Sequence, residues 1–197
     1  MAYTWGYLKE ASLAKLDLDE NEASIQNLIG RFVYYANEVI TQISSAIKPK
    51  RTFAKFTITK NDLFISKTMP SDFISFGDDV CTIKHKDQFG DTWLRSCTDE
   101  DIIYKGYNNI QFLQEGEYEI SYNSRWYTFS KDLKDSTVIN VPDDILECIP
   151  SYIAHQCYKI DDEVKSSIYR NEYEMLLSRI DDTNYKSVKS LHITGGW

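Results

Sequence analysis

The spacing of apolar residues changes twice along this chain, and this change constrains the fold more than any single motif. From Ile25 to Ile47, apolar residues recur three or four positions apart, which is the spacing of one face of an α-helix. Pro49 follows, and a proline disfavours helical backbone in the residue before it. We therefore predict a long amphipathic helix that ends at Pro49, has an acidic cap-like start at residues 19–22 and follows a shorter helix from Thr4 to about Leu16.

Between residues 50 and 141 the period becomes that of β-strands. The clearest strand places Tyr118, Ile120 and Tyr122 on one face and acidic or small residues on the other. Short strands about 8–12 residues apart, separated by turn residues, favour a small antiparallel sandwich or barrel. The predicted strands are 52–58, 63–66, 80–84, 92–95, 102–104, 110–113, 117–122, 126–129 and 138–141.

Helical spacing returns at Pro142, whose position ahead of two aspartates suits the first turn of a helix. An apolar stripe continues to Ile160, and Pro150 either kinks this helix or marks its true beginning. Asp161 and Asp162 then open a last helix, with these residues on one face: Tyr169, Tyr173, Leu176 and Ile180. Residues 182–197 have no period and are predicted to form an extended tail.

These patterns predict an α+β fold. Residues 1–49 and 142–181 each carry an apolar stripe that must be covered, so the economical solution packs them into one helical bundle. Residues 50–141 then form a β lobe inserted into that bundle, and 182–197 extend from its end.

Charge, cysteines and hydropathy exclude several classes of protein. The formal net charge of −8 argues against general nucleic-acid binding, which normally requires a basic surface. The four cysteines form no CxxC pair, and we expect free, half-buried thiols in a reducing cytoplasm. There is no signal peptide, and no apolar run approaches the ~20 residues of a membrane span. We therefore expect a protein made in the cytosol that does not enter a membrane.

The sequence offers little for catalysis. His155 and Cys157 are two positions apart on a predicted helix, so they point to nearly opposite sides and form no local nucleophile–base pair. Most of the paired aspartates stand at helix boundaries, where capping explains them. No phosphate-binding glycine loop, dinucleotide fingerprint, GxSxG or HExxH occurs. We predict no catalytic residue, no metal and no cofactor, and hence no enzyme.

Two charged segments stand out. One is basic and contains no acid: Lys48, Lys50, Arg51, Lys55 and Lys60. It is either a solvated face or a contact with phosphates or with an acidic ring of partners. The segment 135–163 is its opposite, with seven acids and one lysine.

The aromatic residues also allow two interpretations. Tyr118, Tyr122, Trp126, Tyr127 and Phe129 form either the core and rims of the β lobe or a stacking platform for sugars or bases. Trp197 closes a Gly-Gly stretch at the end of the tail, where partner docking and a disordered end are equally good explanations.

The order of elements resembles the head-to-tail connector, or adaptor (head-completion), family of tailed bacteriophages. The resemblance spans roughly residues 8–180 and is carried by the loop 70–73, the strand 118–122 and the segment 141–144 that leads into two closing helices. Pro150 departs from the uninterrupted helix expected there. The resemblance implies a structural virion protein, made in the host cytoplasm and located at the neck.

Proteins of this family form a ring, commonly of twelve copies, beneath the portal protein. The ring extends the channel through which DNA passes without sequence-specific binding, and it carries the next neck or tail component. C-terminal segments of such proteins often dock onto the portal, which by position assigns portal contact to Tyr185, Leu191, Ile193 and Trp197. The basic and acidic segments would suit the two different faces of a ring contact.

Other interpretations remain. The chain is alternatively another phage neck or tail-completion protein. From a different class, the β lobe is a carbohydrate- or nucleic-acid-binding module, which burial of Tyr118, Tyr122 and Trp126 would count against.

Overall fold

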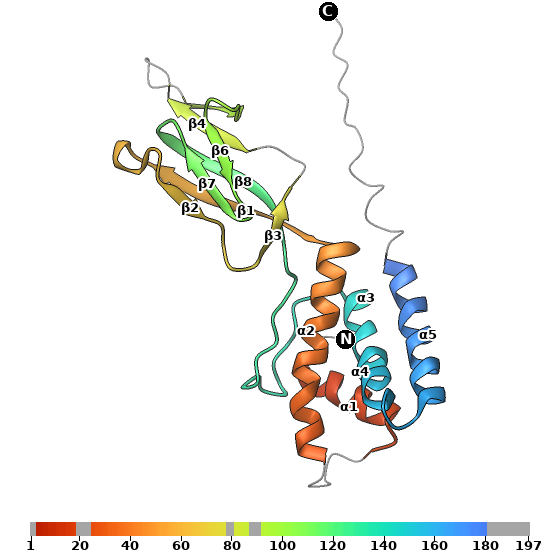
Figure 1. Ribbon diagram of the computed structural model, residues 1–197. Coiled ribbons are helices and arrows are strands. Elements are labelled where there is room, and N and C mark those ends of the chain that lie inside the picture. Colours follow the sequence, from red (N-terminus) through yellow and green to blue (C-terminus); the bar gives the residue numbers. More distant parts are fainter. Residues whose placement is uncertain (1–2, 19–24, 78–80, 87–91, 181–197) are drawn as a thin grey trace, which may run out of the picture. The chain divides into compact units, whose positions relative to one another are not determined.

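The computed structural model describes residues 3–18, 25–77, 81–86 and 92–180. The fold is mixed α+β with antiparallel sheets, as predicted. Two compact units divide the chain: Met1–Lys48 together with Trp126–Trp197 form a helical unit, and Pro49–Arg125 form a β unit (Figure 1). The β unit therefore ends at Arg125, sixteen residues before the boundary at 141 that the sequence suggested.

The helical unit draws its helices from both ends of the chain. They are α1 (Trp5–Lys15), α2 (Gln26–Ala46), α3 (Asp143–Leu146), α4 (Cys148–Tyr158) and α5 (Glu163–Ile180). The Thr4 hydroxyl caps α1 by accepting a hydrogen bond from the Tyr7 amide at 3.2 Å, as predicted. The cap-like stretch 19–22 lies outside the described residues.

Both closing helices start at residues that suit a helix N-terminus. Pro150 lies in the first turn of α4, where its missing N–H would have had no partner within the helix. It therefore lies at the beginning of α4, which a single residue with helical backbone, Glu147, separates from α3. At α5, Asp162 caps the first turn, because its Oδ1 accepts a hydrogen bond from the Lys165 amide at 2.9 Å.

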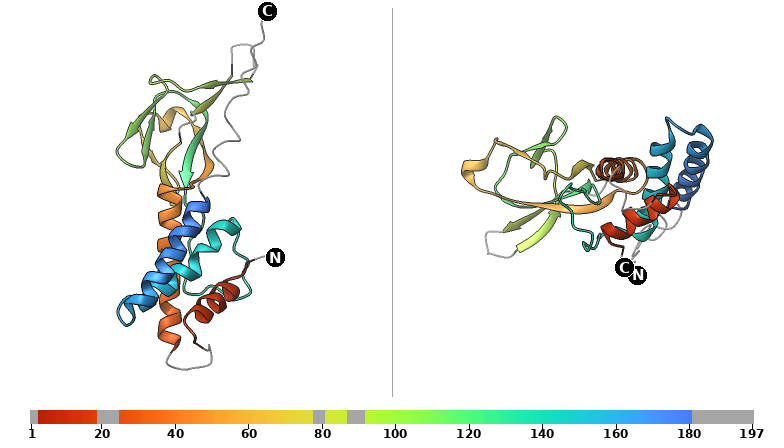
Figure 2. Two further views of the ribbon diagram at one scale, coloured as in Figure 1. Left: turned by 90° about the vertical axis from the view of Figure 1, so that its right-hand side faces the viewer. Right: turned by 90° about the horizontal axis from the view of Figure 1, so that it is seen from below.

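The core of the helical unit is centred on α4. Figure 1 and the right-hand view of Figure 2 show α4 between α2 and α5, and α4 also packs against α1. The apolar stripe predicted on the long helix is the face that α2 buries. The fully buried apolar side chains of this unit are Leu8, Phe32, Ala36, Val39, Ile40, Ile43, Ile145, Leu146, Cys148, Ile149, Ile153 and Ala154.

Residues 126–141 are not the two strands that we predicted. Apart from an isolated bridge between Thr4 and Val138, this segment has no strand pairing. Its backbone bonds to α2 instead: the Asn37 side chain accepts from the Phe129 amide at 2.8 Å and donates to the Phe129 carbonyl at 2.9 Å. The alternation of apolar residues was real, but it reflects burial of Phe129 and Ile139 against helices.

The β unit contains two antiparallel sheets. One has the order β1 (Lys50–Ile58), β8 (Gly116–Ser124), β4 (Thr82–Lys86) and β5 (Thr92–Ser96), with β3 (Phe73–Phe76) also paired to β8. The other has the order β2 (Ser66–Thr68), β7 (Asn109–Phe112) and β6 (Ile102–Lys105). The strand β8 is central to the first sheet because β1 pairs along its whole length.

The predicted alternation of β8 is confirmed. Tyr118, Ile120 and Tyr122 are buried in a core that Ile83, Ile110 and Phe112 complete. The intervening acids face the other way and pair across the sheet, Glu119 with Lys55 and Glu117 with Lys84. A face with apolar residues at every second position is thus buried, as the physics of a pleated strand requires.

Sequence patterns missed two local features of this unit. The strand expected at 63–66 starts only at Ser66, as β2; a turn occupies residues 63–64 and follows the 3-10 turn Lys60–Asp62. Asp62 accepts hydrogen bonds from both the amide and the hydroxyl of Thr59, a local bonding pattern that competes with strand pairing. The short strand β3 begins at Phe73, within the segment where the sequence predicts a loop.

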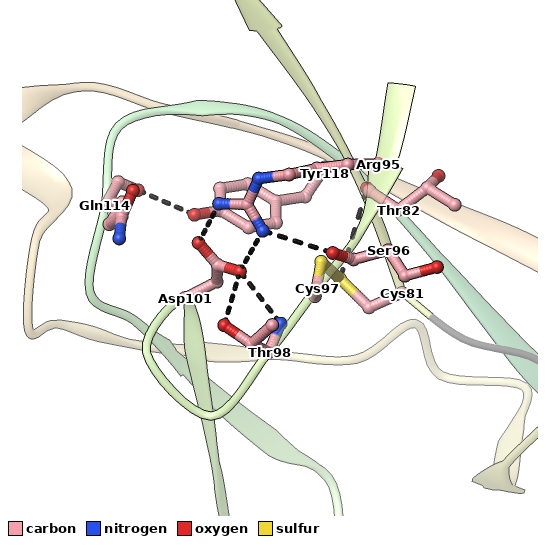
Figure 3. The surroundings of a disulfide bond; sticks show 9 residues. All are labelled: Cys81, Thr82, Arg95, Ser96, Cys97, Thr98, Asp101, Gln114 and Tyr118. Atoms are coloured by element: carbon pink, nitrogen blue, oxygen red, sulfur yellow. Dashed lines mark hydrogen bonds and ion pairs between the residues drawn. A yellow bond between two sulfur atoms is a disulfide. The ribbon is translucent and has the colours of Figure 1, made fainter. Parts of the chain in front are cut away.

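The cysteine prediction is wrong for one pair. Cys81 and Cys97 form a disulfide with a Cα–Cα distance of 5.3 Å (Figure 3). They flank the β4–β5 hairpin directly outside the pair Thr82–Ser96, so strand register brings together two residues that are 16 apart in sequence. Cys148 and Cys157 are free, as predicted.

Candidate interaction surfaces

The residues assigned to portal docking cannot be placed. Tyr185, Leu191, Ile193 and Trp197 all lie outside the described residues. Their docking role stays a prediction, and the last described helix, α5, leads directly into their segment.

The basic segment is not brought together as one cluster. Lys48 belongs to the helical unit, where its Nζ pairs with Asp144 at 2.7 Å and joins the end of α2 to the start of α3. Along β1, successive side chains alternate between faces, so Lys50 and Arg51 point to opposite sides. Lys60 follows in the 3-10 turn. The five residues therefore do not form a single phosphate-binding patch.

The place of β1 in its sheet gives the basic residues a structural role. Among the described strands, none pairs with the outer edge of β1. Charged side chains, lysine above all, block unwanted pairing at such an edge. Lys55 pairs across the sheet with Glu119 at 3.3 Å, and its side chain is 81% exposed, so this ion pair contributes little stability.

Much of the acidic segment stabilises the helical unit itself. Asp135 pairs with Lys9 at 2.6 Å, Asp144 with Lys48, and Glu147 accepts from the Tyr3 hydroxyl at 3.2 Å. Asp162 caps α5. Five acids of the segment are exposed: Asp135, Asp143, Glu147, Asp161 and Glu163. Asp135 and Glu147 take part in the contacts just described, which leaves Asp143, Asp161 and Glu163. Only these keep the property that made the segment a candidate for contact with another subunit.

The aromatic residues do not form a stacking platform. Tyr118 and Tyr122 are only 2% and 4% exposed, and burial raises the pKa of each to about 12. Trp126 belongs to the helical unit and donates its indole N–H to the Lys48 carbonyl at 2.7 Å. The five aromatic residues are thus divided between two cores. This burial counts against a sugar- or base-binding β module.

The thiols and the histidine of α4 are engaged in packing. Burial raises the pKa of Cys148 to about 12 and that of Cys157 to about 11, so neither thiol is activated as a nucleophile. His155 Nδ1 lies 2.9 Å from the Ser166 hydroxyl and thereby links α4 to α5. Within the described parts of the chain, no group of three or more His, Cys, Asp or Glu could hold a metal ion.

One buried charge cluster lies in the β unit beside the disulfide (Figure 3). The Asp101 carboxylate is fully buried. It accepts hydrogen bonds from both terminal nitrogens of Arg95, from the Thr98 amide at 2.8 Å and from the Thr98 hydroxyl at 3.1 Å. Hydrogen bonding from Arg95, outweighing desolvation, lowers the pKa of Asp101 to about 2. Because residues of the same chain supply the hydrogen-bond donors for this carboxylate, the cluster stabilises the β unit and is not a binding site.

Comparisons with known proteins do not identify a family. No protein-family model matches the chain, and no curated protein matches it significantly. In the described helices, no stretch is both long and apolar enough to cross a membrane. The functional conclusion therefore depends on the residues and their arrangement.

Proposed function

We propose that this protein is a structural virion component, a head-to-tail adaptor that forms a ring beneath the portal of a tailed bacteriophage. The observation that carries the proposal is the discontinuous helical unit. Helices from both ends of the chain share one core, and the β unit is inserted between them. This is the organisation that the resemblance to adaptor proteins implied.

The finer architecture belongs to the same proposal. We take the helices around α4 to be a bundle, supported by the core that α1, α2, α4 and α5 share. The two sheets of the β unit form a small sandwich, supported by a single core with residues from both, such as Ile120 and Ile110. The β unit then serves as a structural lobe carried by the bundle.

The role of the ring is to extend the DNA channel and to carry the next neck or tail component. A net charge of −8 suits a wall past which DNA slides without adhering. Of the basic residues considered for ring or phosphate contact, Lys48 is used inside the helical unit. Lys50, Arg51, Lys55 and Lys60 remain the candidates.

Docking to the portal is assigned to the segment after α5, through Tyr185, Leu191, Ile193 and Trp197. Aromatic and large aliphatic side chains are the usual anchors of protein–protein contacts. The order of the chain supports this assignment, because α5 ends at Ile180 and the candidate anchors all follow it.

The test is negative-stain imaging of the protein mixed with the portal protein encoded beside it. Full-length chain should cap one end of the portal ring, and chain cut before Asn184 should not. Trp197→Ala should weaken the cap, whereas Lys186→Ala in the same segment serves as the matched control. A truncated chain that still caps the portal would refute the docking role. If neither form caps the portal, the result would favour the alternative assignment as another neck or tail-completion protein.

A further inference from the structure

The outer face of α5 carries a stripe of exposed apolar side chains. Val164, Ile168 and Met175 are 72%, 57% and 48% exposed, and Ile160 continues the stripe just before the helix. At about 100° per residue, this stripe lies opposite the face that α5 buries through Ser166, Tyr173 and Ile180. Polar Asn171 separates Met175 from Ile168 on this face, so the apolar patch is formed mainly by Ile160, Val164 and Ile168. Exposed apolar patches of this kind mark surfaces that other molecules cover.

The same unit has a hollow with an apolar floor on a different side. It encloses about 230 Å³ between α1, α2 and the segment near Leu133. Trp5 and Val33 form buried parts of its floor. A Cβ added at Gly30 would meet nothing within 4 Å, so the wall of the hollow is open there. A space of this size accommodates one or two aliphatic side chains.

The hollow and the stripe lie on different parts of the helical unit. The hollow lies between α1 and α2, whereas the stripe lies on the face of α5 opposite its buried residues, and α4 packs between α2 and α5 (Figure 1). A projecting apolar stripe on one surface and an apolar hollow on a different surface are what head-to-tail association of identical subunits requires.

Charges at the two surfaces are complementary. Exposed Asp161 and Glu163 stand beside Ile160 and Val164 at the start of the stripe, where residues 159–165 contain three acids and two lysines. Three charged residues line the hollow: Lys9, Lys131 and Asp135. Lys9 and Asp135 pair with each other at 2.6 Å, so the charge left over in this lining is that of Lys131, whose ammonium lies 5.1 Å from the centre of the Tyr34 ring. Complementary charge favours one orientation of the contact and disfavours others.

We propose that the α5 stripe of one subunit fits into the α1–α2 hollow of the next copy of this chain. Val164 and Ile168 enter the hollow, and Lys131 of the second copy faces Asp161 and Glu163. This inference rests on the proposed ring, for which it names the contact between neighbouring subunits.

Disulfide trapping tests the contact directly. Gly30→Cys and Ile168→Cys place one thiol at each surface, in a Cys157→Ser background that removes the half-buried thiol. With oxidised glutathione as the oxidant, the double variant should give a ladder of dimers, trimers and larger species. An equimolar mixture of the two single variants should give dimers only, because each subunit then has one reactive side.

Two controls make the trapping specific. Val164→Glu should reduce the ladder at least tenfold, whereas Ile65→Glu, at a similarly exposed position of the β unit, should leave it unchanged. Lys131→Glu should reduce the ladder several-fold, and combining it with Glu163→Lys should restore it. Far-ultraviolet circular dichroism of each variant checks that the exposed substitutions leave the fold intact.

Several outcomes would overturn the inference. Absence of the ladder would show that something other than a second copy covers the stripe. Dimers from Ile168→Cys alone would indicate that two stripes meet each other. Portal capping without the ladder would reject this contact and leave the adaptor function intact, whereas the ladder without capping would retain the contact and reject the adaptor function.

Discussion

Replacing Asp101 by asparagine should destabilise the β unit by about 3 kcal/mol. Asparagine has nearly the size of aspartate, so the packing is preserved and the change is mainly one of charge. In the wild-type chain, the buried carboxylate accepts hydrogen bonds from both terminal nitrogens of Arg95 and from the Thr98 amide and hydroxyl. An amide can keep the bonds from Thr98 through its one oxygen, but it presents an N–H₂ to one Arg95 nitrogen.

The magnitude follows from the burial of the pair. Removing one partner of a buried ion pair costs about 3–5 kcal/mol, because the other charge remains in a poorly solvated site. The Arg95 side chain is 26% exposed, whereas that of Asp101 is fully buried. Water can therefore reach part of the guanidinium in the variant, which places the cost at the lower end of that range.

Native-state hydrogen exchange of the full-length chain, followed by mass spectrometry, measures this loss within the β unit. Peptides from β7 and β8 should exchange about a hundredfold faster, since ~1.4 kcal/mol corresponds to a tenfold change. Peptides from α4 provide an internal reference, because they belong to the other unit. Asp99→Asn is the matched control: Asp99 is exposed two residues away and should give no change.

A loss below about 1 kcal/mol, or an equal loss for Asp99→Asn, would refute the reasoning. The pH dependence offers a second check, because the pKa of Asp101 falls from the ordinary 3.8 to about 2 on folding. A lowered folded-state pKa contributes stability above the unfolded value and loses it as pH falls through the folded value. The advantage of wild type over Asp101→Asn should therefore be complete at about pH 6 and shrink between about pH 4 and pH 2.

Two further predictions concern cross-links between distant segments. Replacing Cys81 and Cys97 together by serine should lower the stability of the β unit by about 3 kcal/mol, as expected for a closed loop of this length, measured as a lower urea midpoint in the same exchange peptides. A reducing agent should reproduce this shift in wild type and have no effect on the double variant. Asn37→Ala should cost the helical unit about 1–3 kcal/mol because it leaves the Phe129 amide and carbonyl without their partner. Asn37→Asp, which keeps the acceptor for the Phe129 amide, should lose less; equal losses would show that this bond is not the cause.

The sequence by itself determined the elements with a strong period. The stripe from Ile25 to Ile47 could be buried only as one face of a helix, and the alternation around Ile120 only as one face of a sheet. Local capping chemistry was also visible, as Thr4 and the aspartates before α5 show. These features depend only on residues that are close in sequence, so they can be predicted without knowledge of the fold.

Only the tertiary structure decided which segments meet. Residues 126–141 have the alternation of a strand, but the helices supplied hydrogen-bond partners and a core that the sequence pattern could not reveal. The pairing of Cys81 with Cys97 depends on the register of β4 and β5, and the partner of Lys48 lies 96 residues away in Asp144. Likewise, the sequence predicted the face through which α5 packs, but only the structure shows that Val164, Ile168 and Met175 on its other face stay exposed. Long-range contacts of this kind depend on how faces of separate elements fit together, which no local period encodes.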